Sequence, residues 1–161
     1  MATQLEAADA RAASRQGDGA AGLLGGGKAL GRSQANPLRA HDMILRGLPA
    51  GALERLLGAL VCLPQREALE KAIGISLRTW QRRKDVRARP LSPEQSGRAW
   101  KFAEILAKAS EIFGSQEDAE RWLGLPALGL EGRRPLDLLA SPAGVALVED
   151  LLTRLEYGVY Q

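Results

Sequence analysis

Basic side chains crowd the stretch between residues 76 and 89, and their density is suited to binding phosphate. The stretch begins S-L-R-T-W-Q-R-R-K from Ser76 to Lys84, and six basic residues face a single acid, Asp85, between residues 78 and 89. Neutralising the phosphates of a nucleic acid requires this kind of charge density. A helix here would direct its N-terminal residues at base edges and its flanks at the backbone.

The residue types divide this segment into two roles. Arginine can pair with guanine O6 and N7, and glutamine with adenine N6 and N7. The expected base contacts are therefore Arg78, Thr79 and Gln81 or Arg82, and the expected phosphate contacts are Arg83, Lys84, Arg87 and Arg89. Leu77 and Trp80 are expected to pack inward. A solvated basic helix without a nucleic-acid partner is the alternative interpretation.

The elements that would position these residues have the proportions of a helix-turn-helix. One helix is predicted to begin near Pro64 and to end at Gly74, whose freedom to adopt a positive φ suits a helix end. Ser76 would cap a second helix running through Arg83 or Lys84. Tight units of this kind usually have a small residue four positions before the turn glycine, where this chain has Glu70. Either the two helices cross more widely than usual or the motif is degenerate.

Start and stop signals predict further helices, and no segment alternates with the period of a strand. The predicted helices run from about 49 to 61, from Ser92-Pro93 to Gly114, from Ser115 to Gly124, and from Ser141-Pro142 to just before Gly158. The four large aromatic residues on their apolar stripes are expected in the core: Trp100, Phe102, Phe113 and Trp122. The sequence therefore predicts an all-α fold.

Charge is unevenly distributed along the 161 residues, whose formal net charge is +3. Residues 1–40 carry +2, residues 41–99 carry +5 and residues 100–161 carry −4. A basic middle favours a polyanionic partner, and an acidic last third argues against contact with that same partner. Residues 1–40 are rich in Ala and Gly without a sustained period, which predicts a disordered leader. A basic arm that touches DNA is the alternative for this leader.

Several classes of protein are excluded by what the sequence contains. One cysteine, Cys62, and one histidine, His41, allow no intramolecular disulfide and supply no ligand set for zinc. No nucleophile has a base partner and no Gly-rich loop follows a strand, so neither an enzyme nor a cofactor is predicted. No apolar run reaches the roughly 20 residues of a membrane span. A cytoplasmic protein without a membrane partner is expected.

Four motifs, in order, resemble an antitoxin of the Xre/MbcA/ParS type over residues 45 to 161. They are G-I-S-L-R-T-W-Q-R-R-K, L-S-P-E-Q-S-G-R-A-W, A-S-E-I-F-G-S-Q-E-D-A-E-R-W-L and P-L-D-L-L-A-S-P-A-G-V-A-L-V-E-D-L-L-T-R-L-E-Y-G. The resemblance implies an Xre-like helix-turn-helix domain at 41–90 and a small helical toxin-binding domain at 91–161. It also implies a RES-class toxin, which consumes NAD, as partner. Operator DNA, a homodimer and a toxin–antitoxin hetero-oligomer complete the implied assemblies, and the antitoxin itself is not an enzyme.

By position, the resemblance implies that the toxin-facing residues lie on the last helix and the tail: Glu149, Leu152, Arg154, Leu155, Tyr157, Gly158, Val159, Tyr160 and Gln161. A short tail can enter a pocket made for a nucleotide, so it would block the toxin's active site. Core packing is an equal alternative for Tyr157. Arg133 and Arg134 stand where the family often has a less charged turn, and they would contact an acidic rim or solvent. A helical dimerisation and partner-binding adaptor without DNA binding is the alternative function.

Overall fold

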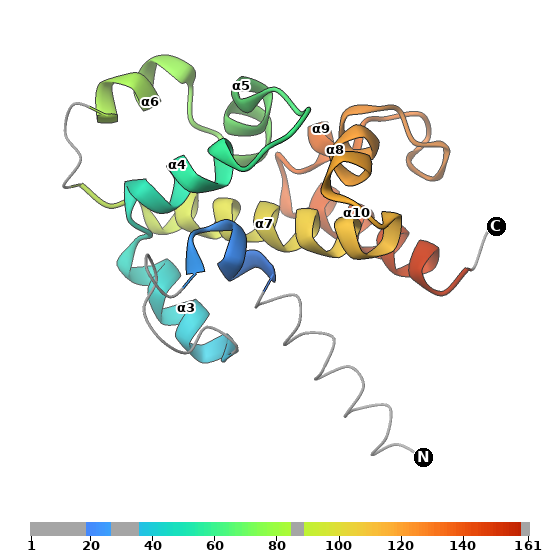
Figure 1. Cartoon of the computed structure of the whole chain (residues 1–161), viewed down its shortest axis with the longest axis horizontal. Coiled ribbons are helices and arrows are strands. Elements are labelled where there is room, and N and C mark those ends of the chain that lie inside the picture. Colours follow the sequence, from blue (N-terminus) through green and yellow to red (C-terminus); the bar gives the residue numbers. More distant parts are fainter. Residues whose placement is uncertain (1–18, 27–35, 85–88, 159–161) are drawn as a thin grey trace.

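One long helix organises the molecule. The protein is described by a computed structural model over residues 19–26, 36–84 and 89–158, and in these ranges it has helices and no strand, only an isolated bridge between Ala127 and Arg133. The predicted all-α fold is confirmed. Helix α7 (Pro93–Phe113) runs through the middle, and the other elements pack around it (Figure 1). Within these ranges no helix combines the length and the hydropathy needed to cross a membrane.

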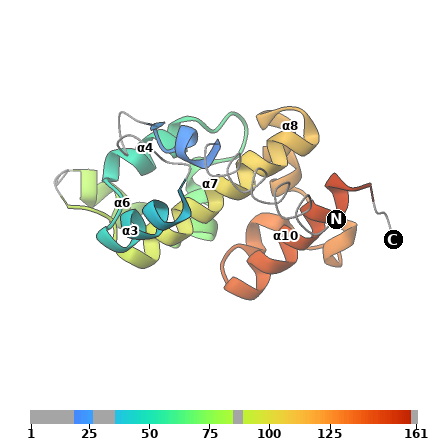
Figure 2. The same ribbon diagram turned by 90° about the horizontal axis from the view of Figure 1, so that it is seen from below.

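The basic segment belongs to a group of short elements at one end of α7. Figure 2 shows α3 and α6 at this end, opposite α8 and α10. The elements of this N-terminal half are α3 (Pro37–Arg46), α4 (Ala50–Gly58), α5 (Gln65–Glu67), η1 (Ala68–Ile73) and α6 (Leu77–Lys84). Of these, η1 is a π-helical turn.

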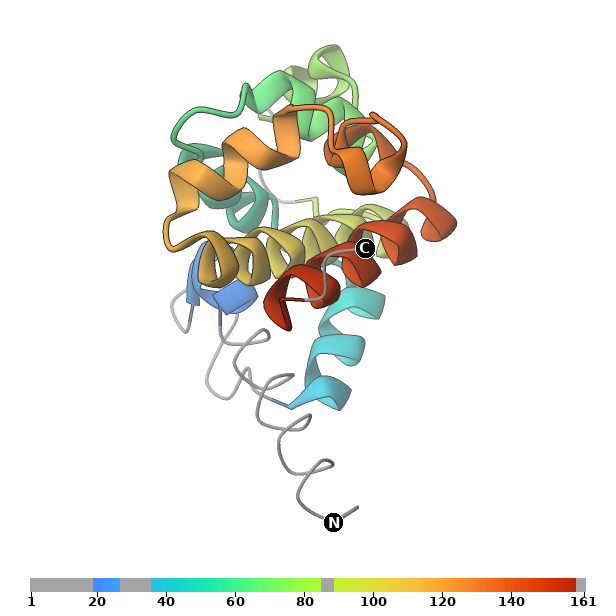
Figure 3. The ribbon, with the colours of Figure 1, turned by 90° about the vertical axis from the view of Figure 1, so that its right-hand side faces the viewer.

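The other end of α7 carries the C-terminal half. Its elements are α8 (Gln116–Gly124), the 3-10 turn η2 (Leu128–Leu130), α9 (Pro135–Leu138) and α10 (Pro142–Glu156). In Figure 3, α8 lies above α7 and α10 lies below it. Because α7 contributes to both halves, it fixes their positions relative to each other.

The starts of α7, α8 and α10 form where the sequence predicts them, whereas α4 ends at Gly58 rather than near residue 61 and α3 was not predicted. Ser92 Oγ accepts from the backbone N–H of Gln95 at 3.1 Å, while Gln95 Oε1 accepts from the N–H of Ser92 at 3.2 Å, which is a complete capping box. The side chains of Ser115 and Ser141 cap α8 and α10 by accepting from the backbone N–H groups of Asp118 and Gly144, each at 3.1 Å. Gly114 ends α7 with φ 86°. Local backbone chemistry therefore defines these boundaries.

The core is continuous across both halves. Phe102, Ala103 and Leu106 of α7 are buried in a single core cluster that includes side chains from both halves. Trp100 and Phe102 are buried, as predicted, whereas Phe113 and Trp122 are only half-buried and contact each other with ring centroids 5.3 Å apart and ring planes tilted by 36°. Burying a large apolar side chain stabilises a fold by about 1.5–3 kcal/mol. The two halves therefore share much of their stabilisation.

The predicted disordered leader is wrong for the part of residues 1–40 that the structure describes. Ala20, Ala21 and Leu24 are completely buried in the core cluster. A Cβ added at Gly19 would lie 2.9 Å from Cβ of Ala107, so this turn packs closely against α7. Helix α3 begins at Pro37, with Asn36 as its cap. The segment is too short to show a helical period, but its small residues fit a close approach to α7. Residues 1–18 and 27–35 lie outside the described ranges.

Candidate functional sites

Two side chains hold the start of the basic helix α6. Ser76 Oγ accepts from the backbone N–H of Thr79 at 3.1 Å, as the capping pattern predicts. Glu70 Oε1 accepts from the N–H of Leu77 at 3.3 Å. Glu70 is therefore compatible with the helix crossing. Its carboxylate bonds the N–H of Leu77, one of the groups at the start of α6 that have no partner within the helix. Its charge also suits the positive end of the helix dipole.

The turn before α6 differs from the prediction. The sequence predicts a regular helix from Pro64 to Gly74, but only Gln65–Glu67 is α-helical and the following turn, η1, is wider. The N–H groups of Gly74 and Ile75 both donate to the carbonyl of Leu69, at 2.9 and 3.1 Å. Gly74 adopts φ 79°, which allows this closure and ends the helix as expected.

Arg98 of α7 locks this turn in place. Its Nε donates to the carbonyl of Ala72 at 2.8 Å, and its Nη2 donates to the carbonyl of Lys71 at 3.0 Å. These two carbonyl groups lie at the end of η1, where no following helical turn supplies N–H donors for them. A Cβ at Gly74 would collide with the guanidinium of Arg98. Glycine at position 74 therefore avoids backbone strain at a positive φ and leaves space for the guanidinium of Arg98.

The outward face of α6 presents most of the predicted DNA contacts. Trp80 is buried and anchors the helix, and Leu77 is half-buried beneath it. Arg78, Thr79, Gln81 and Arg82 are exposed, and Arg83 is partly exposed. Thr79, Arg82, Arg83 and Arg89 line one hollow of about 250 Å³. The side chain of Lys84 and the whole of Arg87 lie outside the described part of the chain.

The arginines of this face are free to bind anions. Within the described ranges, no carboxylate lies within ion-pair distance of Arg78, Arg82, Arg83 or Arg89. Arg83 Nη1 donates to the carbonyl of Pro90, at 3.4 Å. Unpaired guanidinium groups around a hollow match the geometry of a phosphate. The basic face is therefore a suitable nucleic-acid interface.

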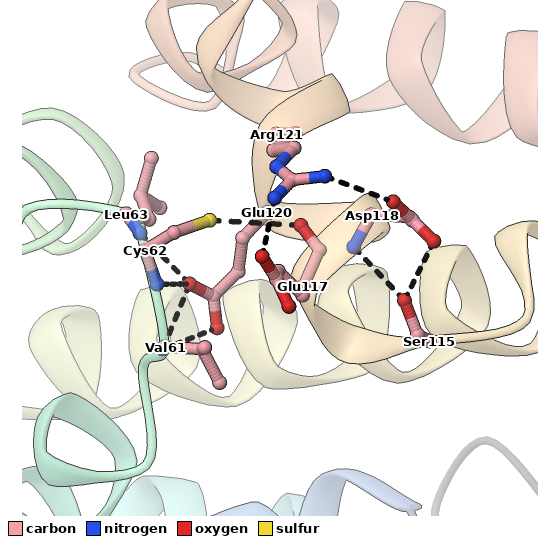
Figure 4. A network of polar contacts seen from close by, with 8 residues as sticks. All are labelled: Val61, Cys62, Leu63, Ser115, Glu117, Asp118, Glu120 and Arg121. Atoms are coloured by element: carbon pink, nitrogen blue, oxygen red, sulfur yellow. Dashed lines mark hydrogen bonds and ion pairs between the residues drawn. The ribbon is translucent and has the colours of Figure 1, made fainter.

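A buried carboxylate joins the two halves of the molecule. Glu120 of α8 is 1% exposed and accepts from the backbone N–H groups of Val61, Cys62 and Leu63 at 2.7–2.9 Å (Figure 4). Gln116 Nε2 adds a fourth bond at 2.7 Å. Burial disfavours the charge, but the hydrogen bonds from Leu63, Gln116, Val61 and Cys62 together hold the pKa of Glu120 below its ordinary value. Glu120 therefore fixes the loop before α5 against α8.

A second connection involves Arg134. Its Nη1 lies 2.9 Å from a carboxylate oxygen of Glu67 in α5, and two further nitrogens bond Asp137 of α9 at 2.9 and 3.0 Å. Lys71 Nζ also approaches Asp137, at 3.5 Å. The hydrogen bonds from Arg134 lower the pKa of Asp137. Arg134 thus bonds residues of the same molecule, whereas the sequence analysis expected it to contact an acidic rim or solvent. Arg133 is exposed.

Three of the expected toxin contacts face the rest of the protein. Glu149 Oε1 lies 3.0 Å from Lys101 Nζ of α7. Burial opposes the charge of Lys101, but hydrogen bonds to Glu104 and Glu149 raise its pKa. Leu152 is completely buried and has no surface to offer a partner, and Leu155 is half-buried against the core.

The remaining expected toxin contacts lie at the end of α10. Tyr157 is 70% exposed, so it is outside the core, and Gly158 follows with φ 67°. Arg154 Nη2 lies 3.2 Å from Asp150 on the same helix. Val159, Tyr160 and Gln161 lie beyond the described residues. An exposed helix end leading into a terminal segment is compatible with contact to a partner.

Known protein families account for both halves. Residues 39–104 match the antitoxin Xre-like helix-turn-helix domain, and residues 108–158 match the antitoxin Xre/MbcA/ParS C-terminal toxin-binding domain. The two matches meet inside α7, the helix that both halves share. A helix-turn-helix domain joined to a toxin-binding domain defines an antitoxin of a toxin–antitoxin system.

Curated relatives agree with this class. An Antitoxin Xre from Pseudomonas putida is 32% identical over 124 residues, which are 77% of this chain and 75% of the relative. Another from Yersinia enterocolitica is 36% identical over 99 residues, 61% of this chain and 66% of the relative, just under two thirds of its length. A Prs ADP-ribosylating antitoxin from Sphingobium is 28% identical and covers 79% of this chain and 84% of the relative. The chain belongs to the Xre/MbcA/ParS antitoxins, as its motifs predict.

Proposed function

We propose that this antitoxin neutralises a RES-type toxin that degrades NAD, and that it represses its own operon by binding DNA through α6. It acts in the cytoplasm as a binding protein without an enzymatic activity of its own, as a homodimer and in a hetero-oligomer with the toxin. The observation that carries the proposal is the path of α10, which leads directly from a toxin-binding domain to the exposed Tyr157 and the last residues.

Blockade by the tail is supported by the rigidity of the helix before it. Val148 and Leu152 are completely buried, and Lys101 and Lys108 of α7 bind Glu149 and Thr153 at 3.0 and 2.8 Å. A fixed helix confines the segment that follows it, so less entropy is lost when that segment enters a pocket. Tyrosine side chains add contact area at a low entropy cost.

DNA binding is supported by the arginines around the hollow beside α6, which have no carboxylate partner in the part of the chain that the structure describes. A degenerate motif, for which Glu70 was the sign in the sequence, would favour the alternative, an adaptor without DNA binding. That argument weakens because Glu70 helps to cap α6, where it stabilises the helix that would enter the groove. The acidic C-terminal half would stay away from the DNA.

Co-expression tests the toxin assignment. The product of the neighbouring reading frame is expressed alone, with the full chain, and with a chain that stops after Glu156. The full chain is expected to restore growth and cellular NAD, and the shortened chain to fold but to lose protection. A toxic product that leaves NAD unchanged would contradict the RES assignment. Protection by the shortened chain would contradict blockade by the tail.

Fluorescence anisotropy tests DNA binding. The labelled probe is the promoter segment upstream of the chain's own gene, titrated with the full chain between 50 and 200 mM salt, a range over which affinity for phosphate contacts falls steeply. Binding that weakens strongly with salt is expected. A probe that stays unbound at the lowest salt would support the adaptor without DNA binding.

A further inference from the structure

Helix α3 keeps an apolar stripe in solvent. Leu38 is 72% exposed, and Leu45, seven residues later on the same helix, is 56% exposed. His41 and Asp42 lie between them and are exposed as well. Because residues three and four positions apart share a face of a helix, these four side chains form one continuous surface, which we call the α3 stripe.

The opposite face of α3 is fixed to the core. Ala40 is buried, and Ile44 packs against the core cluster. A Cβ added at Gly97 of α7 would lie 3.7 Å from Cγ2 of Ile44, so the two helices are in close contact. Just after α3, the N–H of Leu48 donates to the buried Oγ of Ser96 at 2.8 Å. Turning the α3 stripe inward would expose Ala40 and Ile44, so the stripe can leave water only by contact with another molecule.

The α3 stripe is complementary to itself. If a second copy of α3 packs against it antiparallel, about a two-fold axis midway between His41 and Asp42, then Leu38 of each copy faces Leu45 of the other. The same axis places His41 of each copy opposite Asp42 of the other. The leucine pairs would leave water, and an imidazole N–H can donate to a carboxylate oxygen. A two-fold interface requires this match of one patch with itself.

We propose that the homodimer forms through the α3 stripe, with a second copy of this chain as the partner. This inference rests on the proposed function, which includes a homodimer but no surface for it. In Figure 2, α3 and α6 lie at one end of α7, opposite α8 and α10. The dimer therefore joins two copies of α6 in one assembly, as a two-fold helix-turn-helix protein requires to read two half-sites. The C-terminal half of each copy remains available to the toxin.

The size of the contact predicts a weak dimer. Ten helical residues span about 15 Å, and two such helices bury less than the roughly 1,200 Å² of a stable complex. Dimerisation should therefore depend on concentration. Sedimentation velocity of the full chain from about 1 to 200 µM, the range in which weak complexes dissociate, measures the dissociation constant.

Substitutions at the ends of the α3 stripe test the apolar contacts. Leu38→Asp and Leu45→Asp are each expected to raise the dissociation constant about 10-fold or more, since every change occurs twice in a two-fold dimer and places charges in an apolar contact. Leu125→Asp is the matched control, because Leu125 is 60% exposed and directly follows α8 in the other half of the molecule. It should dimerise like the wild type. Circular dichroism should show equal helix content in all variants.

An exchange of charges tests the antiparallel register. His41→Asp alone would set carboxylates against each other on both sides of the axis, and it should also weaken the dimer about 10-fold. Combining it with Asp42→His restores an imidazole opposite each carboxylate, so this double variant should dimerise like the wild type. A parallel pair would set each position against itself, and the exchange would then bring no recovery.

The outcomes separate this inference from the proposed function. If the wild type dimerises and both leucine variants dimerise equally well, another surface forms the homodimer, and the α3 stripe is overturned while the homodimer stands. Equal weakening by Leu125→Asp, or no recovery in the exchange variant, would also overturn it. If the wild type stays monomeric at the highest concentration, the homodimer and this inference are both wrong. Co-expression with the toxin and anisotropy with DNA test the remaining parts of the proposed function independently.

Discussion

α6 and α10 are both proposed to contact a partner, but they differ in whether their charged side chains are paired within the molecule. On α6, the arginines at 78, 82 and 83 have no carboxylate partner within the described ranges. On α10, Glu149, Asp150 and Glu156 are all paired with cations of α7 or of α10 itself. The exposed apolar residues here include Leu147 on α10 and Tyr157 directly after its last residue. One helix offers charge, and the other offers apolar area.

The comparison changes the meaning of the acidic C-terminal third. Its carboxylates are not only a repulsive surface, since Glu120 binds the loop at 61–63 and Asp137 binds Arg134 and Lys71. These bonds hold the C-terminal half against the helix-turn-helix half. Acidic residues there stabilise the fold, while basic residues on α6 stay available for a ligand.

The largest loss of stability is expected when the buried, hydrogen-bonded carboxylate of Glu120 is changed. Glu120→Gln replaces one acceptor oxygen by an NH₂ group facing backbone donors, and it should lower the free energy of unfolding by about 3 kcal/mol. Urea unfolding at pH 7 measures this. Glu117→Gln is the control, because Glu117 lies on the same helix and forms only an exposed pair with Arg121. That change should cost no more than about 0.5 kcal/mol.

The stability difference between the wild type and Glu120→Gln should depend on pH. Since the folded pKa of Glu120 is lowered, its carboxylate stabilises the protein above the ordinary carboxyl pKa, and this contribution is lost as the pH falls towards the folded pKa. Glutamine does not titrate. The stability difference between wild type and Glu120→Gln should therefore narrow below about pH 4.3, the ordinary value for glutamate. A difference that stays constant from pH 7 to pH 3 would show that the charge of Glu120 contributes nothing.

Removing charge from α6 should affect DNA binding alone. Arg82→Ala with Arg83→Ala is expected to weaken operator binding about 100-fold at low salt and to reduce the salt slope by about 1–2. Protection against the toxin and helix content should not change. Arg133→Ala, an exposed arginine in the C-terminal half, is the control and should bind DNA like the wild type. Loss of toxin protection in the double variant would mean that the two surfaces are not independent.

Local signals in the sequence were sufficient for α4, α6, α7, α8 and α10, but not for the turn at 19–26 or for α3, η2 and α9. The serine caps at 76, 92, 115 and 141 act between residues three apart, so the sequence contains the whole interaction. The exposure of Arg78 and Arg82 follows equally from the position of Trp80 on the same short helix. Family resemblance then supplied the order of the two domains.

Long-range contacts were not predictable in this way. Glu120 is bonded to residues nearly sixty positions earlier in the sequence. Near Glu120 itself, the sequence shows only that an acidic residue shares an apolar helix face with Ala119 and Leu123. Nothing near Leu128 indicates that a turn would hold it in solvent. Whether Glu149 faces a partner or Lys101 depends on how α10 rotates against α7, which only tertiary packing decides.

A smaller effect is expected from the turn that positions α6. Gly74→Ala imposes a Cβ at φ 79° and displaces Arg98 from the carbonyls of Ala72 and Lys71, so stability should fall by about 2 kcal/mol. Gly114→Ala is a matched control, since Gly114 has φ 86° but open space around it, and it should cost only about 1 kcal/mol. Equal losses in thermal unfolding would show that the Arg98 contact is worth nothing. A weaker operator affinity is expected for Gly74→Ala alone.

The smallest effect distinguishes the two flanks of α10. Glu149→Gln removes a half-exposed ion pair with Lys101, and such pairs contribute about 0.5 kcal/mol or less to stability. Because Glu149 faces α7, the change should leave the affinity for the toxin unaltered, whereas Arg154→Ala, at another of the proposed toxin contacts on α10, should weaken it. Calorimetry with the neighbouring gene product measures both variants under the same conditions. If Glu149→Gln weakens binding as much as Arg154→Ala does, the toxin contacts the flank beside α7, and the contrast between engaged charge and open apolar surface on α10 is wrong.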